Sequence, residues 1–103
     1  MSAFADIIVE QMRRDILRLL AAQPNYAANN VVLGLALERV HALRVTADQI
    51  RAELAWLAQL RLVTLIALNP STSMVKLTER GSDVAKGLST IPGIAALVPG
   101  DGT

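Results

Sequence analysis

The sequence has 103 residues, a formal net charge of +1, one histidine and no cysteine. A chain of this length accommodates one domain, and its 52% of hydrophobic and 18% of charged residues exclude the disordered class. Without cysteine there is no disulfide framework and no cysteine-ligated zinc site, which is typical of a protein in a reducing cytoplasm.

The first predicted element is an amphipathic helix over residues 2–22. Its apolar residues recur every three or four positions, and Pro24 follows its end. At roughly 1.5 Å per residue the helix is about 30 Å long, which is the width of a small domain. We therefore expect its first turns, with Phe4, Ile7 and Ile8, to project from the core and to contact a second copy.

A polar connection over residues 25–30 follows, in which Asn29 or Asn30 is placed to cap the next helix. We expect that helix over residues 31–42. Gly34 lies within it at a cost of about 1 kcal/mol relative to alanine, so we expect close packing against another helix at this position. The predicted buried stripe of the helix consists of Val31, Val32, Leu35 and Val40.

The third predicted helix spans residues 47–60 and begins with a capping box. Thr46 can accept a hydrogen bond from the amide three residues on, while the side chain of Gln49 reaches back to the start of the helix. Ala52 and Ala55 then lie on its outward side. The predicted inward stripe consists of Ile50, Leu54, Leu57 and Leu60.

A hairpin and a fourth helix complete the predicted elements. β-Branched and leucine-rich residues without a helical period predict a strand over residues 62–68. A turn over residues 69–73 leads to a returning strand over residues 74–77. Thr78 caps a helix over residues 79–86.

This order of elements is the plan of the winged helix-turn-helix fold. In that fold the third helix enters the major groove of DNA, and the hairpin, or wing, lies beside it. We predict a mainly α fold with one small β-hairpin, formed by a winged helix-turn-helix domain over residues 1–87. An irregular apolar tail follows over residues 88–103. We expect Ile91 and Ile94 of this tail to join the first helix, of the same or a second subunit, in a dimer contact.

Two passages resemble winged-helix regulators, namely residues 46–63, TADQIRAELAWLAQLRLV, and residues 75–87, VKLTERGSDVAKG. At full length the chain is similar to small winged-helix proteins of Mu-like phages and prophages, which are often labelled ArsR-type. The resemblance implies a phage-encoded DNA-binding protein in the cytoplasm of a bacterial host. It is carried by FADII (residues 4–8), RDILRLL (14–20), AWLA (55–58), LTERG (77–81) and TIPG (90–93).

The chain departs from the family pattern at two points. The residue after the third helix is often glycine, because the chain passes through the left-handed region there. Here it is Arg61, which adopts that conformation at some strain. Metal-sensing ArsR relatives have cysteines or clustered histidines, and this chain has neither, so the resemblance implies no metal sensing.

The third helix supplies the candidate base-reading residues. Arg51 can pair with guanine and Gln49 with adenine, while Ala52 and Ala55 would let the backbone approach the groove closely. The alternative interpretation is that Gln49 serves only the capping box and that Arg51 is a solvated or salt-bridged residue. The candidate phosphate-binding residues are Arg44, Thr46 and Lys76.

The charge pattern weakens the case for DNA. Residues 46–60 contain one arginine and two acidic residues, and the wing turn, residues 69–73, has no charge, although phosphate attraction supplies most non-specific affinity. A protein with a net charge of +1 therefore needs segregated arginines or a homodimer to hold double-stranded DNA. The alternative is a winged-helix module that binds a phage or host protein, or an accessory factor in phage DNA packaging or assembly.

The sequence argues against catalytic, metal-binding and membrane functions. It lacks a cysteine nucleophile, a second histidine and a glycine-rich phosphate loop, so we predict no enzyme activity, no cofactor and no metal site. We expect His41 at a helix end and Trp56 at the edge of the core. The longest uncharged run, residues 19–37, contains Pro24 and three asparagines, so we expect no membrane span, and without a basic N-terminal segment we expect no signal peptide.

Overall fold

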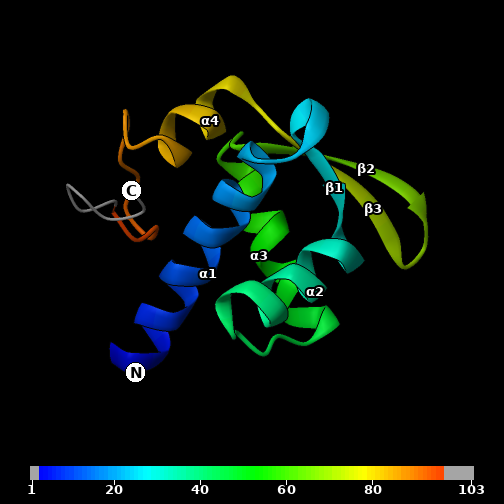
Figure 1. Cartoon of the computed structure of the whole chain (residues 1–103), viewed down its shortest axis with the longest axis horizontal. Helices are drawn as coiled ribbons and strands as arrows, with labels where there is room; N and C mark the ends of the chain where they lie inside the picture. The colour runs from blue at the N-terminus through cyan, green and yellow to red at the C-terminus, as the bar shows by residue number, and fades with distance from the viewer. Residues whose placement is uncertain (1–2, 97–103) are drawn as a thin grey trace.

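The computed structural model describes residues 3–96, which form a helical layer beside a three-stranded antiparallel sheet (Figure 1). Ser2 and residues 97–103 of the predicted tail lie outside the described residues. The described helices are α1 (Ala3–Ala21), α2 (Asn30–His41), α3 (Ala47–Gln59) and α4 (Glu79–Ala85), with a 3-10 turn, η1 (Pro24–Tyr26), after α1. The strands are β1 (Ala27–Asn29), β2 (Val63–Asn69) and β3 (Thr72–Leu77), in the order β1-β3-β2.

The winged-helix fold is confirmed, with one strand more than predicted. The polar connection over residues 25–30 contains β1, which pairs antiparallel with β3 so that Ala28 lies opposite Val75. Alanine and asparagine have low strand propensity, so β1 exists because β3 offers an unpaired edge and not because of its own sequence. Its place in the sheet brings the start of α2 next to the wing, which β2 and β3 form.

The core is aliphatic and lies between α1, α2, α3 and the base of the sheet. Among its fully buried side chains are Leu17 and Leu20 of α1, Leu37 of α2, Leu57 of α3 and Val75 of β3. Asp15 is buried in the same region at 4% exposure, and its Oδ2 lies 3.4 Å from Nδ1 of His41. His41 thus stands at the end of α2, as predicted.

The predicted buried stripe of α2 is wrong. Asn30, Leu33 and Leu37 are the buried residues of this helix, three and four positions apart. The predicted stripe lies on the opposite side, because α2 is valine- and leucine-rich around its circumference and the pattern did not distinguish its faces. The four residues that were predicted to be buried and are instead 48–67% exposed are Val31, Val32, Leu35 and Val40.

The local signals around α3 are confirmed. The Oγ1 atom of Thr46 accepts from the Gln49 amide at 3.1 Å, and the Thr46 amide donates to Oε1 of Gln49 at 2.8 Å. After the helix, Arg61 adopts a φ of 61°, the left-handed conformation that usually favours glycine. The side-chain hydroxyl of Thr78 donates to the Arg61 carbonyl at 2.7 Å and so supports this turn.

The first turns of α1 project from the body of the molecule, as predicted (Figure 1). Residues 3–7 are all exposed, and Met12 is the first residue of α1 that enters the core. The described part of the tail, residues 88–96, folds back onto α1 of the same chain, where the Ala95 amide donates to the Glu10 carbonyl at 3.2 Å. Within residues 3–96 no helix has the length and apolar character to cross a membrane.

Two helical glycines have opposite surroundings, which predicts opposite effects of alanine. A Cβ atom at Gly81 of α4 would stand 2.0 Å from the Leu62 carbonyl oxygen, whereas one at Gly34 of α2 would meet nothing within 4 Å. We expect Gly81→Ala to lower the free energy of unfolding by about 1–3 kcal/mol through overpacking. Gly34→Ala should raise it by up to about 1 kcal/mol through helix propensity.

Urea unfolding of both variants beside the wild type measures the two effects. If the urea midpoint of Gly81→Ala equals or exceeds that of the wild type, the close approach of α4 to the backbone at Leu62 is contradicted.

Candidate nucleic-acid interface

The outward side of α3 is the first part of the candidate interface. Because Ile50, Leu54 and Leu57 are buried, the helical period directs the intervening positions to solvent. We call the resulting surface the α3 face. It consists of the exposed residues Asp48, Gln49, Arg51, Ala52 and Ala55.

Arg51 is half-exposed and weakly held. Its Nη2 atom lies 3.0 Å from Oδ1 of Asp48, whose side chain is 93% exposed. An ion pair this accessible to water contributes little to stability, because solvent screens it and the side chains lose freedom in forming it. The guanidinium can therefore exchange Asp48 for another acceptor, so its salt bridge does not remove it from the candidate site.

The side chain of Gln49 is partly occupied by the capping box. Its Oε1 atom accepts from the Thr46 amide, so the predicted capping role of Gln49 is confirmed. A bidentate contact with adenine uses both the oxygen and the nitrogen of a glutamine side chain. Gln49 would have to release the cap to make such a contact.

Ala52 and Ala55 are both exposed on the α3 face. Their side chains are single methyl groups, so another surface can approach the backbone of α3 closely on this side. The structure thus presents an α-helix with a smooth, small-residue side next to the wing, as the sequence predicts.

The predicted phosphate-binding residues do not all lie together. Thr46 caps α3 and Arg44 is exposed in the connection before it. Lys76 is exposed on β3 and pairs with Thr64, whereas the neighbouring residue Val75 is buried and pairs with Leu65.

Leu65 lines a small hollow together with Arg51. Successive strand residues point to opposite sides of a sheet, so Lys76 lies on the sheet face away from Arg51.

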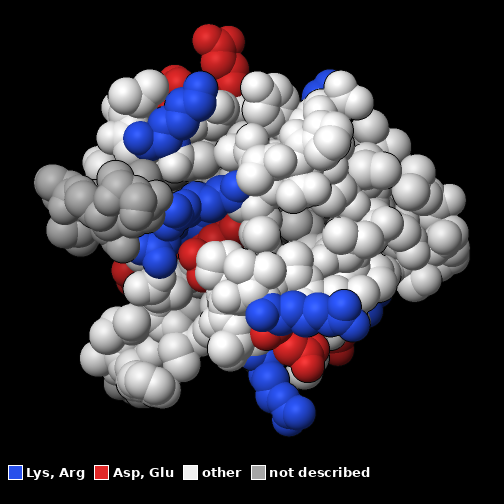
Figure 2. Space-filling model, in the orientation of Figure 1, with Lys and Arg blue, Asp and Glu red and all other residues white. Residues whose placement is uncertain are grey.

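Positive charge is sparse around the α3 face. Lys76 is the single charged residue of the segment 63–77 that forms the wing. In the view of Figure 2 the charged side chains gather over the helices, while the surface over the hairpin tip is uncharged. Part of the wing surface is instead apolar, with Ile66 and Leu68 more than half exposed.

Arg13 of α1 holds α3 and the tail together. Its Nε atom lies 2.6 Å from Oε1 of Glu53, its Nη1 atom donates to the Gly93 carbonyl at 2.8 Å, and its guanidinium stacks 3.7 Å from the ring centre of Trp56. Trp56 is half-buried against the core, as predicted. These contacts neutralise Glu53, an acid that would otherwise repel phosphates from α3, and they occupy Arg13 within the chain.

Asn30 is a site residue that the sequence did not reveal. Its side chain is buried at 6% exposure and joins α2 to the wing turn, since Nδ2 donates to the Ser71 carbonyl at 3.2 Å and Oδ1 accepts from the Ser73 amide at 2.9 Å. Asn29 is the N-cap, and its Oδ1 atom accepts from the Val32 amide at 2.8 Å. In the sequence, Asn29 and Asn30 are equally good candidates for the N-cap of α2. Only the contact with the wing turn and the start of β3 shows that Asn30 has a different role.

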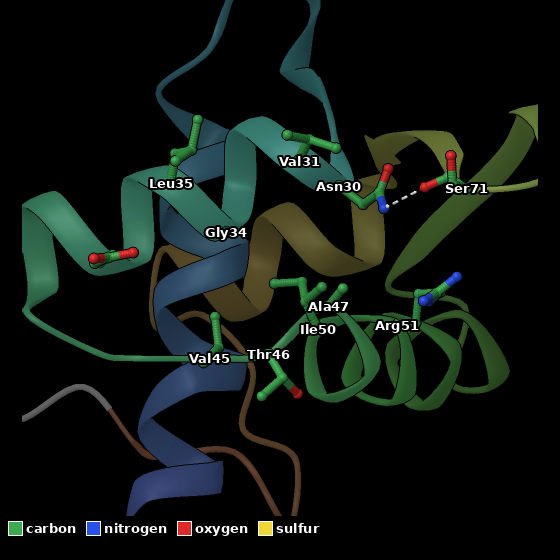
Figure 3. Close-up of a pocket in the computed structure, with 11 residues that line it drawn as sticks. Asn30, Val31, Gly34, Leu35, Val45, Thr46, Ala47, Ile50, Arg51 and Ser71 are labelled. Atoms are coloured by element: carbon green, nitrogen blue, oxygen red, sulfur yellow. Dashed lines mark hydrogen bonds between the residues drawn. The ribbon is translucent and has the colours of Figure 1, made fainter.

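An apolar groove runs between α2 and α3 beside the wing turn, with a volume of about 350 Å³ (Figure 3). We call it the α2–α3 groove. Arg51 and Ser71 stand at its wing end, and Thr46 lies on its α3 side. Its apolar lining consists of Val31, Gly34, Leu35, Val45, Ala47 and Ile50.

The predicted dimer residues differ in their exposure. Phe4 and Ile7 are 71% and 56% exposed, and Ile8 is half-buried. Ile91 is half-buried against the core, and Ile94 is 8% exposed within the core of its own chain. Ile94 therefore offers almost no surface to a second copy, and the contact through the first helix stays a prediction.

Over residues 3–96, no three histidine, cysteine, aspartate or glutamate side chains stand close enough together to hold a metal ion.

The sequence is 37% identical to the uncharacterised protein gp26 of Escherichia phage Mu over 89 residues, which are 86% of this chain and 90% of gp26. No protein-family model matches it. The fold is similar to two solved structures of the winged-helix protein RosR of H. salinarum. One, a complex designated hsRosR-S1, has a TM-score of 0.63 and 22% identity over 84% of this chain and 67% of RosR. The other has a TM-score of 0.64 and 20% identity over 80% of each chain.

These comparisons confirm the winged-helix fold and the similarity to a protein of a Mu phage. The ArsR-type label that the resemblance implied stays a prediction.

The two asparagines before α2 predict two separable effects. Asn30→Ala removes both hydrogen bonds to the wing turn, each worth about 0.5–1.5 kcal/mol, so we expect a loss of about 1–3 kcal/mol in the free energy of unfolding. Amide hydrogen exchange at Ser73 should become faster. Asn29→Ala removes the cap alone, at a cost of about 1 kcal/mol, and should leave exchange at Ser73 unchanged. Equal exchange at Ser73 in the two variants would contradict the role of Asn30.

Proposed function

The chain belongs to the family of gp26 of Escherichia phage Mu, and we propose that it is a winged-helix DNA-binding protein that regulates transcription. In this proposal the protein acts without catalysis or cofactor. It acts in the cytoplasm of the bacterial host. We also propose that it is of the ArsR type. Binding at a promoter changes transcription by occupying DNA that the transcription machinery needs.

The observation that carries the proposal is the α3 face beside the wing. The capped helix of 13 residues is roughly 20 Å long, and the major groove of DNA is about 12 Å wide and admits an α-helix. No described element covers Ala52 and Ala55, which are exposed. Small residues at these positions suit a helix that lies deep in the groove.

The residues have separate roles in this proposal. Arg51 reads base edges, because its guanidinium is half-exposed and its bond to Asp48 is easily exchanged. Arg44 and Thr46 stand before and at the N-terminus of α3, where the helix dipole also favours a phosphate. Lys76 contacts phosphate from the face of the wing that points away from Arg51.

A homodimer supplies the charge that one subunit lacks. With a net charge of +1, a single chain holds few phosphates, whereas two chains double the contacts and bind half-sites about one helical turn apart. We place the contact at the projecting end of α1, where Phe4 and Ile7 are exposed and Ile8 is half-buried.

A second candidate function is binding to a phage or host protein, for example as an accessory factor in phage DNA packaging or assembly. The wing favours it, since Ile66 and Leu68 are 57% and 56% exposed and the wing turn has no charge. Exposed apolar surface of this kind is typical of protein interfaces.

Binding to duplex DNA at increasing salt tests the proposed function. We expect the logarithm of the binding constant to fall linearly with that of the salt concentration, by about 0.9 for each phosphate neutralised. Arg51→Ala should cost about 1–3 kcal/mol at the preferred site and reduce the preference for it. Arg44→Ala should weaken binding to all sequences alike and lower the slope by about one per bound subunit.

Arg80→Ala is the matched control, because Arg80 is an exposed arginine of α4 outside the α3 face. It removes the same charge and should have a smaller effect than Arg44→Ala. An absence of wild-type binding near 50 mM salt, where counterion release favours it most, would rule out DNA as the partner. Unchanged preference in Arg51→Ala would remove the base-reading role of Arg51.

Light scattering at micromolar concentration tests the homodimer. We expect the mass of two chains for the wild type and of one chain for Phe4→Asp, because a charge in place of an exposed aromatic ring cannot enter an apolar contact without a partner. A wild-type mass of one chain contradicts the dimer.

A further inference from the structure

Asp48 lies in the middle of the α3 face. It stands one turn before Ala52 and two turns before Ala55, so the three residues form one stripe at helical spacing. The side chain of Asp48 is 93% exposed, and both alanines are exposed as well. A surface that approaches the backbone of α3 at the two alanines therefore also meets this carboxylate.

The two acidic residues of α3 have different surroundings. Residues 47–59 contain Asp48 and Glu53 as their acids. The side chain of Glu53 is 15% exposed and is bound by Arg13 of α1 at 2.6 Å. Asp48 is bound by Arg51 of its own helix at 3.0 Å and stays open to solvent. The fold thus neutralises one acid from outside the helix and leaves the other on the face that the proposed function directs into the major groove.

A carboxylate that enters the major groove needs a hydrogen-bond donor. Burial of a charge without a partner is costly, and the phosphates offer no donor and repel it. The base edges in this groove present two kinds of donor, N4 of cytosine and N6 of adenine. Adenine also presents the acceptor N7 beside N6, which repels a carboxylate. Cytosine N4 is therefore the group that suits an acidic side chain best.

Asp48 and Arg51 together match the major-groove edge of a G·C pair. Arg51 presents donors, which suit O6 and N7 of guanine, while Asp48 presents acceptors, which suit N4 of cytosine. Without DNA the two side chains satisfy each other, with Nη2 of Arg51 3.0 Å from Oδ1 of Asp48. Because water reaches both, little free energy is lost when each exchanges its partner for a base edge.

We propose that Asp48 is a specificity-determining residue, which accepts a hydrogen bond from cytosine N4 while Arg51 donates to guanine of the same or the neighbouring base pair. This inference rests on the proposed function and names the bases that the α3 face reads. Thymine in place of the cytosine is rejected, because its O4 atom is an acceptor that would face the carboxylate. The negative charge of Asp48 thus lowers the general affinity for DNA and raises the discrimination between bases.

Variants at one exposed position test the proposal, each compared with the wild type on duplexes selected from a random pool. Asp48→Ala removes the carboxylate. Asp48→Asn keeps its size but presents an amide, which suits N6 and N7 of adenine. Glu79→Gln is the matched control, because Glu79 is an exposed acid in the first turn of α4, as Asp48 is in α3, and lies outside the α3 face.

We expect Asp48→Ala to bind duplexes without the preferred site more tightly than the wild type, because a negative charge is removed. At one position of the site it should lose a preference of about tenfold for cytosine over thymine. This position should coincide with, or adjoin, the one at which Arg51→Ala loses its preference for guanine. Asp48→Asn should shift the preference there toward adenine, and Glu79→Gln should keep the wild-type preferences.

The proposal is overturned if Asp48→Ala binds more tightly and keeps every base preference, because the carboxylate then only repels DNA. It is also overturned if Asp48→Asn keeps the wild-type preference, if Glu79→Gln changes it, or if Asp48→Ala and Arg51→Ala act at separate positions. These outcomes leave the proposed function intact. If the wild type binds no duplex, the proposed function fails and this inference fails with it.

Discussion

The buried side chain of Asn30 is the contact on which the arrangement of the interface depends. Its two hydrogen bonds join the start of α2 to the backbone of the wing turn and hold the wing beside this helix. Leu33 and Leu37 follow it at helical spacing and enter the core. The rest of α2 must then face outward, which opens Gly34 to solvent and brings Ser71 to the end of the groove that Arg51 occupies. The polar contact of Asn30 and the burial of Leu33 and Leu37 together determine which apolar residues of α2 stay exposed.

The ten basic residues give little net positive charge because nine acidic residues offset them, and internal ion pairs withdraw two further arginines from the surface. Arg13 is bound to Glu53 and to the tail, and Arg14 lies 3.5 Å from the buried Asp15. Arg13 thus joins α1 to α3 and the tail, and Arg14 stands beside the carboxylate that also faces His41 of α2. A winged helix built in this way has the shape to enter the major groove but a weak electrostatic attraction to it. In the proposed function two subunits must therefore act together.

Features set by neighbouring residues were predictable from the sequence, and features set by distant contacts were not. The capping box at Thr46 and the left-handed Arg61 follow from interactions within a few residues, and both are confirmed. β1 depends on the edge of β3, more than 40 residues away, and its own sequence predicts a loop. The exposed side of α2 was missed for the same reason, since both of its sides are apolar and distant contacts, of Asn30 with the wing and of Leu33 and Leu37 with the core, select the buried one. The sequence shows a glycine at position 34 of this helix, but it does not show that no other atom lies close to it. The expectation of close packing there is therefore wrong.

The α2–α3 groove and the α3 face share residues. Thr46 and Arg51 line the groove and also belong to the proposed DNA contact, so any group bound in the groove covers residues that DNA needs. Linkage makes such competition reciprocal: occupation of the groove weakens DNA binding by the same factor by which DNA weakens occupation of the groove. A homodimer that binds DNA must therefore leave both grooves open. A contact between the projecting ends of α1 meets this condition, because it leaves both α3 faces exposed.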